Sequence, residues 1–398
     1  MNFKDLGLQS ALTEKCRSLG FTEPTPIQQQ AIPAILQGAD IIACAETGTG
    51  KTAAFLLPLI QQLSENKSKG AAVLVLAPTR ELATQIEAAC REFAPTKLRC
   101  VAIIGGTNYK KQISGLRGAD IIVATPGRLI DFMQKGAINF SHLQTLVLDE
   151  ADRMLDMGFL PAIRRILEAI PKKRQTLFFS ATITSEVGKI AKAMMNSRPE
   201  YIEVSRNGQT VELIEQTVYP VSAQSKTVLL LDLLEREKFE RVLVFTRTKR
   251  GADRLAHILE ARSHKSNRIH GDRSQAQREA ALRGFKNGNT RVLVATDVAA
   301  RGIDIDSVSH VINYDVPEVA EDYVHRIGRT GRAGQKGRAI TLVTPGEELT
   351  MRSIEKLTGQ KVERVLLPDF GGVLPTLEKP KKPFRAFARG RSRYSRSR

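Results

Sequence analysis

The sequence has no long apolar run and no leader-like start. Nowhere does an apolar stretch approach the ~18–20 residues that a helix needs to span a bilayer, so an integral membrane protein is not expected. Residues 1–6 (MNFKDL) contain neither an apolar core nor a basic flank, and we therefore expect no secretory signal.

Cysteine is scarce, and its spacing argues against the usual cysteine-rich frameworks. No CxxC pair and no cluster of histidines accompanies the four cysteines, which are Cys16, Cys44, Cys90 and Cys100. A disulfide scaffold and a structural zinc site are therefore not expected. Free thiols in a reducing compartment are the better interpretation, so we expect a cytoplasmic protein.

Charge is distributed unevenly along the chain. Over 398 residues, 60 Lys and Arg stand against 42 Asp and Glu, and the net charge of +18 favours a polyanionic partner. Residues 379–398 hold half of that net charge and contain no acid. From about residue 366 the sequence is dominated by Pro, Gly, Ser and Arg, which predicts a disordered basic tail over residues 366–398.

Short β-branched runs alternate with longer amphipathic stretches through the rest of the chain. This alternation predicts an α/β fold with parallel sheets covered by helices on both faces. The clearest helix is Leu160–Ile170, and a second is marked by the apolar spacing from Ala252 to Leu259. The polar stretch 205–210 (SRNGQT) interrupts the alternation and is interpreted as a linker. The predicted strands are Asp40–Cys44, Ala72–Leu76, Val101–Ile104, Asp120–Ala124, Thr145–Leu148, Gln175–Phe179, Arg241–Phe245, Arg291–Ala295 and His310–Asn313.

The two halves of the chain echo each other. Val73-Leu74-Val75 followed by Thr79-Arg80 is repeated as Val242-Leu243-Val244 followed by Thr246-Arg247. Residues 122–125 (IVAT) are repeated, at nearly the same offset, as residues 293–296 (LVAT). Two echoes at one spacing favour a duplicated α/β domain.

A glycine-rich turn joins the first predicted strand to an apolar helix. It reads Ala45-Glu46-Thr47-Gly48-Thr49-Gly50-Lys51-Thr52. Glycines let backbone N–H groups and a helix N-terminus surround phosphate oxygens, while Lys51 neutralises the β/γ-phosphates and the Thr52 hydroxyl binds Mg²⁺. The alternative is an ordinary βα turn, but the strand before it and the helix after it favour a phosphate loop.

An acidic turn, Asp149-Glu150-Ala151-Asp152, follows the predicted strand Thr145–Leu148. The carboxyl ends of parallel strands are where such sheets place their ligands. We therefore assign Asp149 to Mg²⁺ and Glu150 to the general base that polarises water. Alone, this turn would equally suit a solvated acidic loop, and the phosphate loop upstream favours the catalytic interpretation.

The second half supplies cations and no phosphate loop of its own. His325-Arg326-Ile327-Gly328-Arg329-Thr330-Gly331-Arg332 places arginines among glycines, where one could stabilise charge on a γ-phosphate as another domain closes. A basic surface loop is the alternative. Several strand-end turns combine N–H groups with a hydroxyl or arginine, as phosphodiester contacts require: Pro78-Thr79-Arg80-Glu81-Leu82, Gly105-Gly106-Thr107, Thr125-Pro126-Gly127-Arg128 and Thr296-Asp297. Each taken alone is better interpreted as a plain turn, and their shared place after strand ends favours the phosphate-binding interpretation for the set.

Together these motifs, with Ser180-Ala181-Thr182, resemble those of the DEAD-box ATP-dependent RNA helicases, from Phe3 to about residue 345. The compact core and short basic tail look most like the bacterial RhlE-type subgroup. The resemblance implies two RecA-like domains: residues 1–205 with the ATP-binding motifs, a linker at 206–214, and 215–365 with the arginine fingers, followed by the tail. It also implies ATP and Mg²⁺ as cofactors and RNA as a partner bound through its backbone.

The resemblance further implies roles for individual residues. Catalysis falls to Lys51, Asp149, Glu150, Arg329 and Arg332. Within the nucleotide site, Phe3 would stack on the base, Gln28 would pair with adenine and Asp304 would contact the ribose. The full set of implied nucleotide-binding residues is Phe3, Phe21, Thr25, Gln28, Thr47, Gly48, Thr49, Gly50, Lys51, Thr52 and Asp304. Coupling of hydrolysis to closure falls to Ser180, Thr182, Asp152 and His325. RNA contacts fall to Pro78, Thr79, Arg80, Gly105, Gly106, Thr125, Pro126, Gly127, Arg128, Thr246, Arg247 and Thr296.

One position departs from the family pattern, which usually has Gln where this chain has Glu46. A carboxylate near phosphates weakens ATP affinity unless it faces away. The aromatic and basic residues of the tail suit nonspecific RNA tethering, with a merely solubilising tail as the alternative.

We expect a monomeric helicase that separates short RNA duplexes or remodels RNA–protein complexes, with ribosome-assembly or RNA-decay factors as possible partners. The alternatives are a DNA-directed translocase and an ATP-gated RNA clamp with little turnover.

Overall fold

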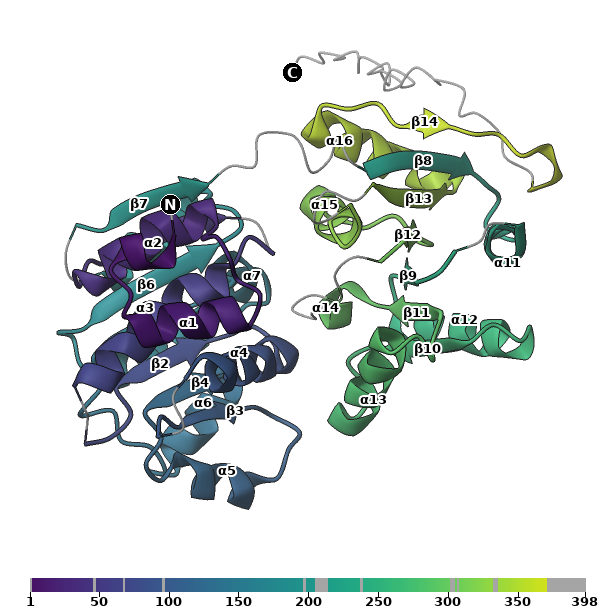
Figure 1. The fold of residues 1–398 in the computed structure, drawn as a ribbon. Helices are drawn as coiled ribbons and strands as arrows, with labels where there is room; N and C mark the ends of the chain where they lie inside the picture. The colour runs from purple at the N-terminus through teal and green to yellow at the C-terminus, as the bar shows by residue number, and fades with distance from the viewer. Residues whose placement is uncertain are drawn as a thin grey trace, which may run out of the picture.

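Two α/β domains follow one another along the chain, each built around its own parallel sheet (Figure 1). The computed structural model describes residues 2–45, 48–66, 69–94, 97–195, 198–204, 214–236, 239–300, 305, 308–331 and 336–370. Among these residues, no helix is both long and apolar enough to cross a bilayer.

The first domain contains a seven-stranded sheet in the order β3-β4-β2-β5-β6-β1-β7. Its strands are β1 (Ile41–Ala45), β2 (Val73–Leu76), β3 (Cys100–Ile103), β4 (Ile121–Ala124), β5 (Thr145–Leu148), β6 (Gln175–Ser180) and β7 (Glu200–Val204). Its helices are η1 (Phe3–Leu6), α1 (Ser10–Ser18), α2 (Pro26–Leu36), α3 (Lys51–Glu65), α4 (Arg80–Phe93), α5 (Tyr109–Leu116), α6 (Pro126–Gln134), α7 (Ala151–Asp156), α8 (Leu160–Ala169) and α9 (Ser185–Met194).

The second domain contains a seven-stranded sheet in the order β10-β11-β9-β12-β13-β8-β14. Its strands are β8 (Ile214–Pro220), β9 (Val242–Phe245), β10 (Ser266–Ile269), β11 (Val292–Ala295), β12 (His310–Asn313), β13 (Gly337–Val343) and β14 (Glu363–Arg364). Its helices are α11 (Lys226–Arg236), α12 (Lys249–Ala261), α13 (Gln275–Lys286), α14 (Asp297–Ala300), α15 (Ala320–Ile327), η2 (Pro345–Glu347), α16 (Glu348–Thr358) and η3 (Pro368–Phe370).

The central strands are apolar along their whole length because helices cover both faces of each sheet. Alternate side chains of a strand point to opposite faces. In β2, Val73 and Val75 accordingly join the apolar cluster under α3 and α4, whereas Leu74 and Leu76 join the cluster under α6 and α8. Burial on both faces is why these strands appear in the sequence as continuous β-branched runs rather than alternating ones.

The α/β fold class predicted from the sequence is confirmed. Every predicted strand is present within one residue at each end, and the helix predicted at Leu160–Ile170 is α8. The two sheets have the same strand order when β1–β7 are matched with β8–β14, so the echoed segments occupy equivalent strands, β2 with β9 and β4 with β11. This equivalence supports a duplicated domain.

Some elements escaped prediction because their sequences are not apolar. β10 has the sequence SNRI, in which only Ile269 is apolar and buried, and it pairs in parallel with β11. The predicted linker falls almost wholly outside the described residues. Beyond residue 365, η3 packs on the second domain, and Phe370 is buried in its core. The rest of the predicted tail lies outside the described residues.

Candidate functional site

The phosphate loop predicted from the sequence lies between β1 and α3, on the side of the first sheet where its strands have their carboxyl ends (here called the carboxyl edge). Gly48 and Gly50 have φ values of 83° and 91°, a conformation that favours glycine. Lys51 is the first residue of α3, and its buried Nζ donates to the carbonyl of Ala45 at 2.7 Å. The lysine is therefore held back across the loop, with its charge at the helix N-terminus where anions bind.

Gln28, predicted to pair with adenine, ties the start of α2 to the phosphate loop. Its Oε1 accepts from the backbone N–H of Thr25 at 3.0 Å, and its Nε2 donates to the carbonyl of Gly50 at 3.1 Å. A Cβ at Gly50 would overlap this amide, so glycine is favoured at this position by the close contact as well as by its positive φ. In this arrangement the Gln28 amide binds protein groups, so reading adenine would require it to exchange these partners.

The stacking role predicted for Phe3 is not supported. Its side chain is only 2% exposed and belongs to the apolar core of the first domain, whereas a ring that stacks on a base needs an open face. Phe21 is 38% exposed, with its ring centroid 5.5 Å from that of Phe93. Of these two aromatics, Phe21 is the one with an accessible surface.

The acidic turn lies at the carboxyl end of β5, and its first two carboxylates are buried. Burial raises the pKa of Asp149 to about 6, an effect that the charge of Lys51 opposes and the charge of Glu150 reinforces. Carboxylate oxygens are the hard donors that Mg²⁺ prefers, so Asp149 is compatible with its predicted metal-binding role. Thr52 follows Lys51 in the first turn of α3, and its role as a metal ligand stays a prediction.

The predicted coupling residues of the first domain form one hydrogen-bonded cluster. Oδ2 of Asp152 accepts from the N–H groups of Ala181 and Thr182 and from the hydroxyl of Thr182, at 2.8–3.0 Å. The Ser180 hydroxyl accepts from the N–H of Asp152 at 3.2 Å and donates to the carbonyl of Thr182. The turn after β5 and the turn after β6 are thus joined directly.

The second domain's predicted nucleotide-site residues have different environments. Arg329 is buried, and His325 is partly exposed, 3.9 Å from Asp322. Arg326, between them, is a structural residue: its guanidinium pairs with Asp297 at 2.6–2.7 Å inside the domain. Four residues of the predicted site lie outside the described residues: Thr47, Asp304, Arg332 and Glu46, the position that differs from the family pattern.

The RNA-contact residues predicted in the first domain follow the carboxyl ends of three neighbouring strands, β2, β4 and β3. The Arg80 guanidinium lies against Gly105 and Gly106, where an added Cβ would overlap or crowd it. Arg128 donates to the carbonyl of Thr107 at 3.1 Å. Thr79, next to Pro78, is the N-cap residue of α4, and its hydroxyl accepts from the N–H of Leu82. Thr125 is the N-cap residue of α6, which begins at Pro126 and Gly127, but its side chain makes no capping hydrogen bond. These turns place N–H groups and arginines side by side, as backbone recognition requires.

The matching residues of the second domain follow the ends of β9 and β11. Thr246 and Thr296 are buried. Arg247 is exposed and pairs with Glu347 at 3.1 Å and with Glu318 at 3.7 Å, beside a hollow of about 640 Å³. An incoming phosphate would compete with these carboxylates for Arg247.

Two ion pairs at the site were missed by the sequence analysis. Glu81 of α4 pairs with Arg278 of α13, which joins the two domains at 2.9 Å. Arg153 of α7 pairs with Glu150 at 2.6 Å. The Arg153 pair had a local signal in its i,i+3 spacing, whereas nothing in the sequence links Glu81 with Arg278.

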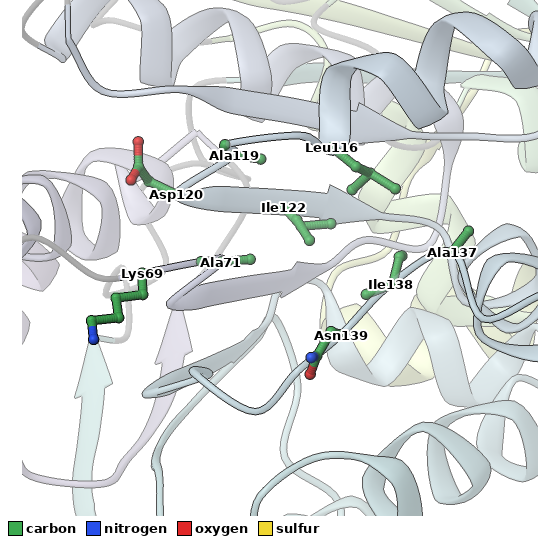
Figure 2. Close-up of a pocket in the computed structure, with 11 residues that line it drawn as sticks. Lys69, Ala71, Leu116, Ala119, Asp120, Ile122, Ala137, Ile138 and Asn139 are labelled. Atoms are coloured by element: carbon green, nitrogen blue, oxygen red, sulfur yellow. The ribbon is translucent and has the colours of Figure 1, made fainter.

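A separate cavity of about 310 Å³ lies on the side of the first sheet where its strands have their amino ends (Figure 2). Ala71 precedes β2 and Asp120 precedes β4, so the cavity opens at the amino ends of the strands. The phosphate loop follows the carboxyl end of β1. This cavity is therefore not part of the candidate nucleotide site.

Known protein families match both domains. Residues 25–190 match the family described as DEAD/DEAH box helicase, and residues 225–334 match the helicase conserved C-terminal domain. The DEAD-box ATP-dependent RNA helicase CshA of Geobacillus kaustophilus is 45% identical over 368 residues, which cover 92% of this chain and 78% of that protein. The chain belongs to the DEAD-box ATP-dependent RNA helicases. As a member of this family, it is an ATP-hydrolysing enzyme.

A second relative of this helicase is CshA of Bacillus subtilis, 45% identical over 370 residues, covering 92% of this chain and 74% of that protein. Both relatives are named CshA, which is a different subgroup from RhlE. The predicted RhlE-type assignment is therefore not confirmed, although the predicted family is.

Solved DEAD-box structures share both domains of this helicase. Saccharomyces cerevisiae Dbp5 bound to RNA and ADP-BeF3 has a TM-score of 0.82 at 33% identity, covering 92% of this chain and 95% of that one. Mss116p bound to single-stranded RNA and AMP-PNP has a TM-score of 0.83 at 30% identity, covering 92% and 78%. A DEAD-box protein from Methanococcus jannaschii is 40% identical and covers 92% and 99%, yet its TM-score is 0.53. The two domains are therefore arranged here as in Dbp5 and Mss116p, whose superpositions are good over both domains, and not as in the Methanococcus jannaschii protein, which superposes poorly despite its higher identity.

Proposed function

We propose that this helicase binds ATP with Mg²⁺ at the carboxyl edge of the first sheet and hydrolyses it there. The observation that carries the proposal is the grouping of buried Lys51, Asp149 and Glu150 at one point on that edge. Lys51 would neutralise the β/γ-phosphates, and Glu150 would accept a proton from the attacking water. Asp149 and Thr52 would hold Mg²⁺, which stabilises charge on the phosphates when bound.

RNA would bind across both domains, on the turns around Arg80 and Arg128 in the first and around Arg247 in the second. Each ligand would favour the closed arrangement of the domains, so each would strengthen binding of the other. In that arrangement Arg329 and Arg332 of the second domain would approach the γ-phosphate. Hydrolysis would then reopen the domains and release a locally unwound RNA. We also propose that the enzyme is monomeric and that it is cytoplasmic; the four free thiols support the second of these.

The deciding experiment measures steady-state ATP hydrolysis without nucleic acid, with single-stranded RNA, and with DNA of the same sequence. We expect strong stimulation by RNA and little by DNA, because the 2′-hydroxyl distinguishes the two. Equal stimulation would favour a DNA-directed translocase instead. Stimulation by neither would favour an ATP-gated clamp, although a buried carboxylate at Glu150 is a group that a pure clamp does not need.

Lys51→Ala tests the site assignment itself. Loss of the ammonium should lower RNA-stimulated hydrolysis by about a hundredfold or more, since it removes a charge aimed at the phosphates. Lys172→Ala, an exposed lysine of the same domain, is the matched control and should hydrolyse ATP like the parent. Unchanged hydrolysis by Lys51→Ala would show that the nucleotide site has been assigned wrongly.

A further inference from the structure

Glu150, the proposed general base, has an unusual backbone conformation for a residue with a Cβ. Its φ and ψ angles are 50° and 52°, in the left-handed region, and it stands at the N-cap position of α7. Side chains with a Cβ rarely adopt this conformation, and it persists only where the surroundings hold it. The side chain of Glu150 also has a charged partner.

Arg153, one turn further along α7, is that partner. Its Nη1 donates to Oε2 of Glu150 at 2.6 Å, and both side chains are only 10% exposed. Charged hydrogen bonds of this length between buried groups are strong and directional. Arg153 engages one carboxylate oxygen and thereby leaves Oε1 as the oxygen that can accept a proton from water.

The same turn of α7 also contacts the segment that couples the domains. The N–H of Arg153 donates to Oδ1 of Asp152 at 2.9 Å, and Oδ2 of Asp152 holds Ala181 and Thr182. The backbone of Arg153 is thus fixed by the coupling cluster while its side chain fixes Glu150. A shift of residues 180–182 would therefore reach Glu150 through Asp152 and Arg153.

We infer that Arg153 is a positioning residue for Glu150, holding the carboxylate in the direction that hydrolysis requires. This inference rests on the proposed function, in which Glu150 is the general base. A misplacement of a reacting group by about 1 Å can cost roughly a hundredfold in rate. Arg153 should therefore affect turnover much more than nucleotide binding, which depends on Lys51 and the phosphate loop.

The test begins with Arg153→Met. We expect RNA-stimulated kcat to fall about ten- to a hundredfold. The Kd for a fluorescent ATP analogue should stay within about threefold of the parent, because the phosphate loop is intact. Arg153→Lys should recover part of kcat, since lysine keeps the charge but loses the planar fork. Arg91→Met removes an exposed arginine that pairs with Glu87 at 2.7 Å in the same domain, and this control should change neither quantity.

A double-mutant cycle distinguishes positioning from general damage. In a Glu150→Gln background, Arg153→Met should cause no further fall in the residual kcat, because Arg153 acts only through the carboxylate. The inference would be overturned if the falls in kcat caused by Glu150→Gln and by Arg153→Met multiplied in the double variant. It would also be overturned if the Arg153→Met enzyme kept a kcat within twofold of the parent. If Arg153→Met does not fold, Arg153→Lys decides: kcat must fall at unchanged nucleotide affinity.

Failure of the proposed function has a different signature in these measurements. A Glu150→Gln enzyme that hydrolyses ATP like the parent would remove Glu150 from the role of general base, whatever Arg153→Met does. A Glu150→Gln enzyme with little turnover, beside an Arg153→Met enzyme with full turnover, would leave the proposed function intact and reject Arg153 alone.

Discussion

Glu81 and Arg278 form an ion pair between the two domains, with Oε2 and Nη2 separated by 2.9 Å. Glu81 is in the first turn of α4, directly after the proposed RNA contact Arg80, and Arg278 is in the first turn of α13. Only 4% and 10% of the two side chains are exposed. Because both charges are withdrawn from water, their mutual attraction is little screened and offsets the cost of burying them; losing one partner would leave the other buried and unpaired.

Arg278→Ala should therefore weaken closure of the domains. Removing one partner of a buried interfacial charge pair costs about 2–5 kcal/mol, so RNA affinity measured with a non-hydrolysable ATP analogue should fall at least about tenfold. RNA affinity without nucleotide should change much less. The swapped variant Glu81→Arg with Arg278→Glu restores opposite charges and should recover part of the loss, whereas equal affinities in all variants would contradict a role in closure.

Gly106→Ala should weaken RNA binding without affecting nucleotide binding. Gly106 has a φ of 75°, and a Cβ there would overlap the guanidinium of Arg80. Alanine should therefore displace Arg80 from the turns proposed to bind RNA, and fluorescence anisotropy with labelled RNA would measure the loss. Gly136→Ala is the matched control, because Gly136 has a φ of 62° but open space around its Cβ position. The control separates backbone strain, about 1 kcal/mol in each variant, from the displacement of Arg80.

Arg326→Met should destabilise the second domain. The Arg326 guanidinium is 2% exposed and bonds to both oxygens of Asp297, to the Asn313 side chain and to the carbonyl of Asp315. Breaking such a buried pair costs about 3–5 kcal/mol, which should appear as a lower urea midpoint for the transition of this domain. Arg283→Met removes an exposed i,i+4 pair and should cost under about 0.5 kcal/mol.

His310 should make stability depend on pH. Burial, with a smaller contribution from the charge of Arg338, lowers the pKa of this imidazole from 6.5 to about 4. Between these values the unfolded chain binds a proton that the folded chain does not, so stability is complete above pH 6.5 and falls as the pH drops towards 4. Glu215 also faces the ring and acts in the opposite direction.

The measurement is urea unfolding at pH 7 and pH 5, for the parent and for His310→Phe. Phenylalanine keeps the contact with Phe239, whose ring centroid is 3.9 Å from that of His310, but cannot bind a proton. The loss of stability between the two pH values should therefore be smaller in the variant. An equal loss in both proteins would assign the pH dependence to other groups.

Much of this protein could be predicted because the informative residues are close together in sequence. The phosphate loop from Gly48 to Thr52, the acidic turn at Asp149 and the buried strands each carry a local pattern with a physical meaning. The glycine-rich turn and the acidic turn lie at the carboxyl ends of β1 and β5, and the strands lie within one residue of their predicted bounds. Phe3 shows the limit of such patterns, because an aromatic residue that stacks on a base and one that fills a core look the same in a sequence.

By itself, the sequence determined the α/β class, the duplication and the set of residues on the carboxyl edge, since these follow from periodicity and short-range spacing. Only the tertiary structure decided which side chains meet. Glu81 pairs with Arg278 of the other domain, and the Gln28 amide donates to the carbonyl of Gly50. Such contacts depend on how separate elements pack and on which charges burial forces to pair, and neither is encoded in the spacing of neighbouring residues.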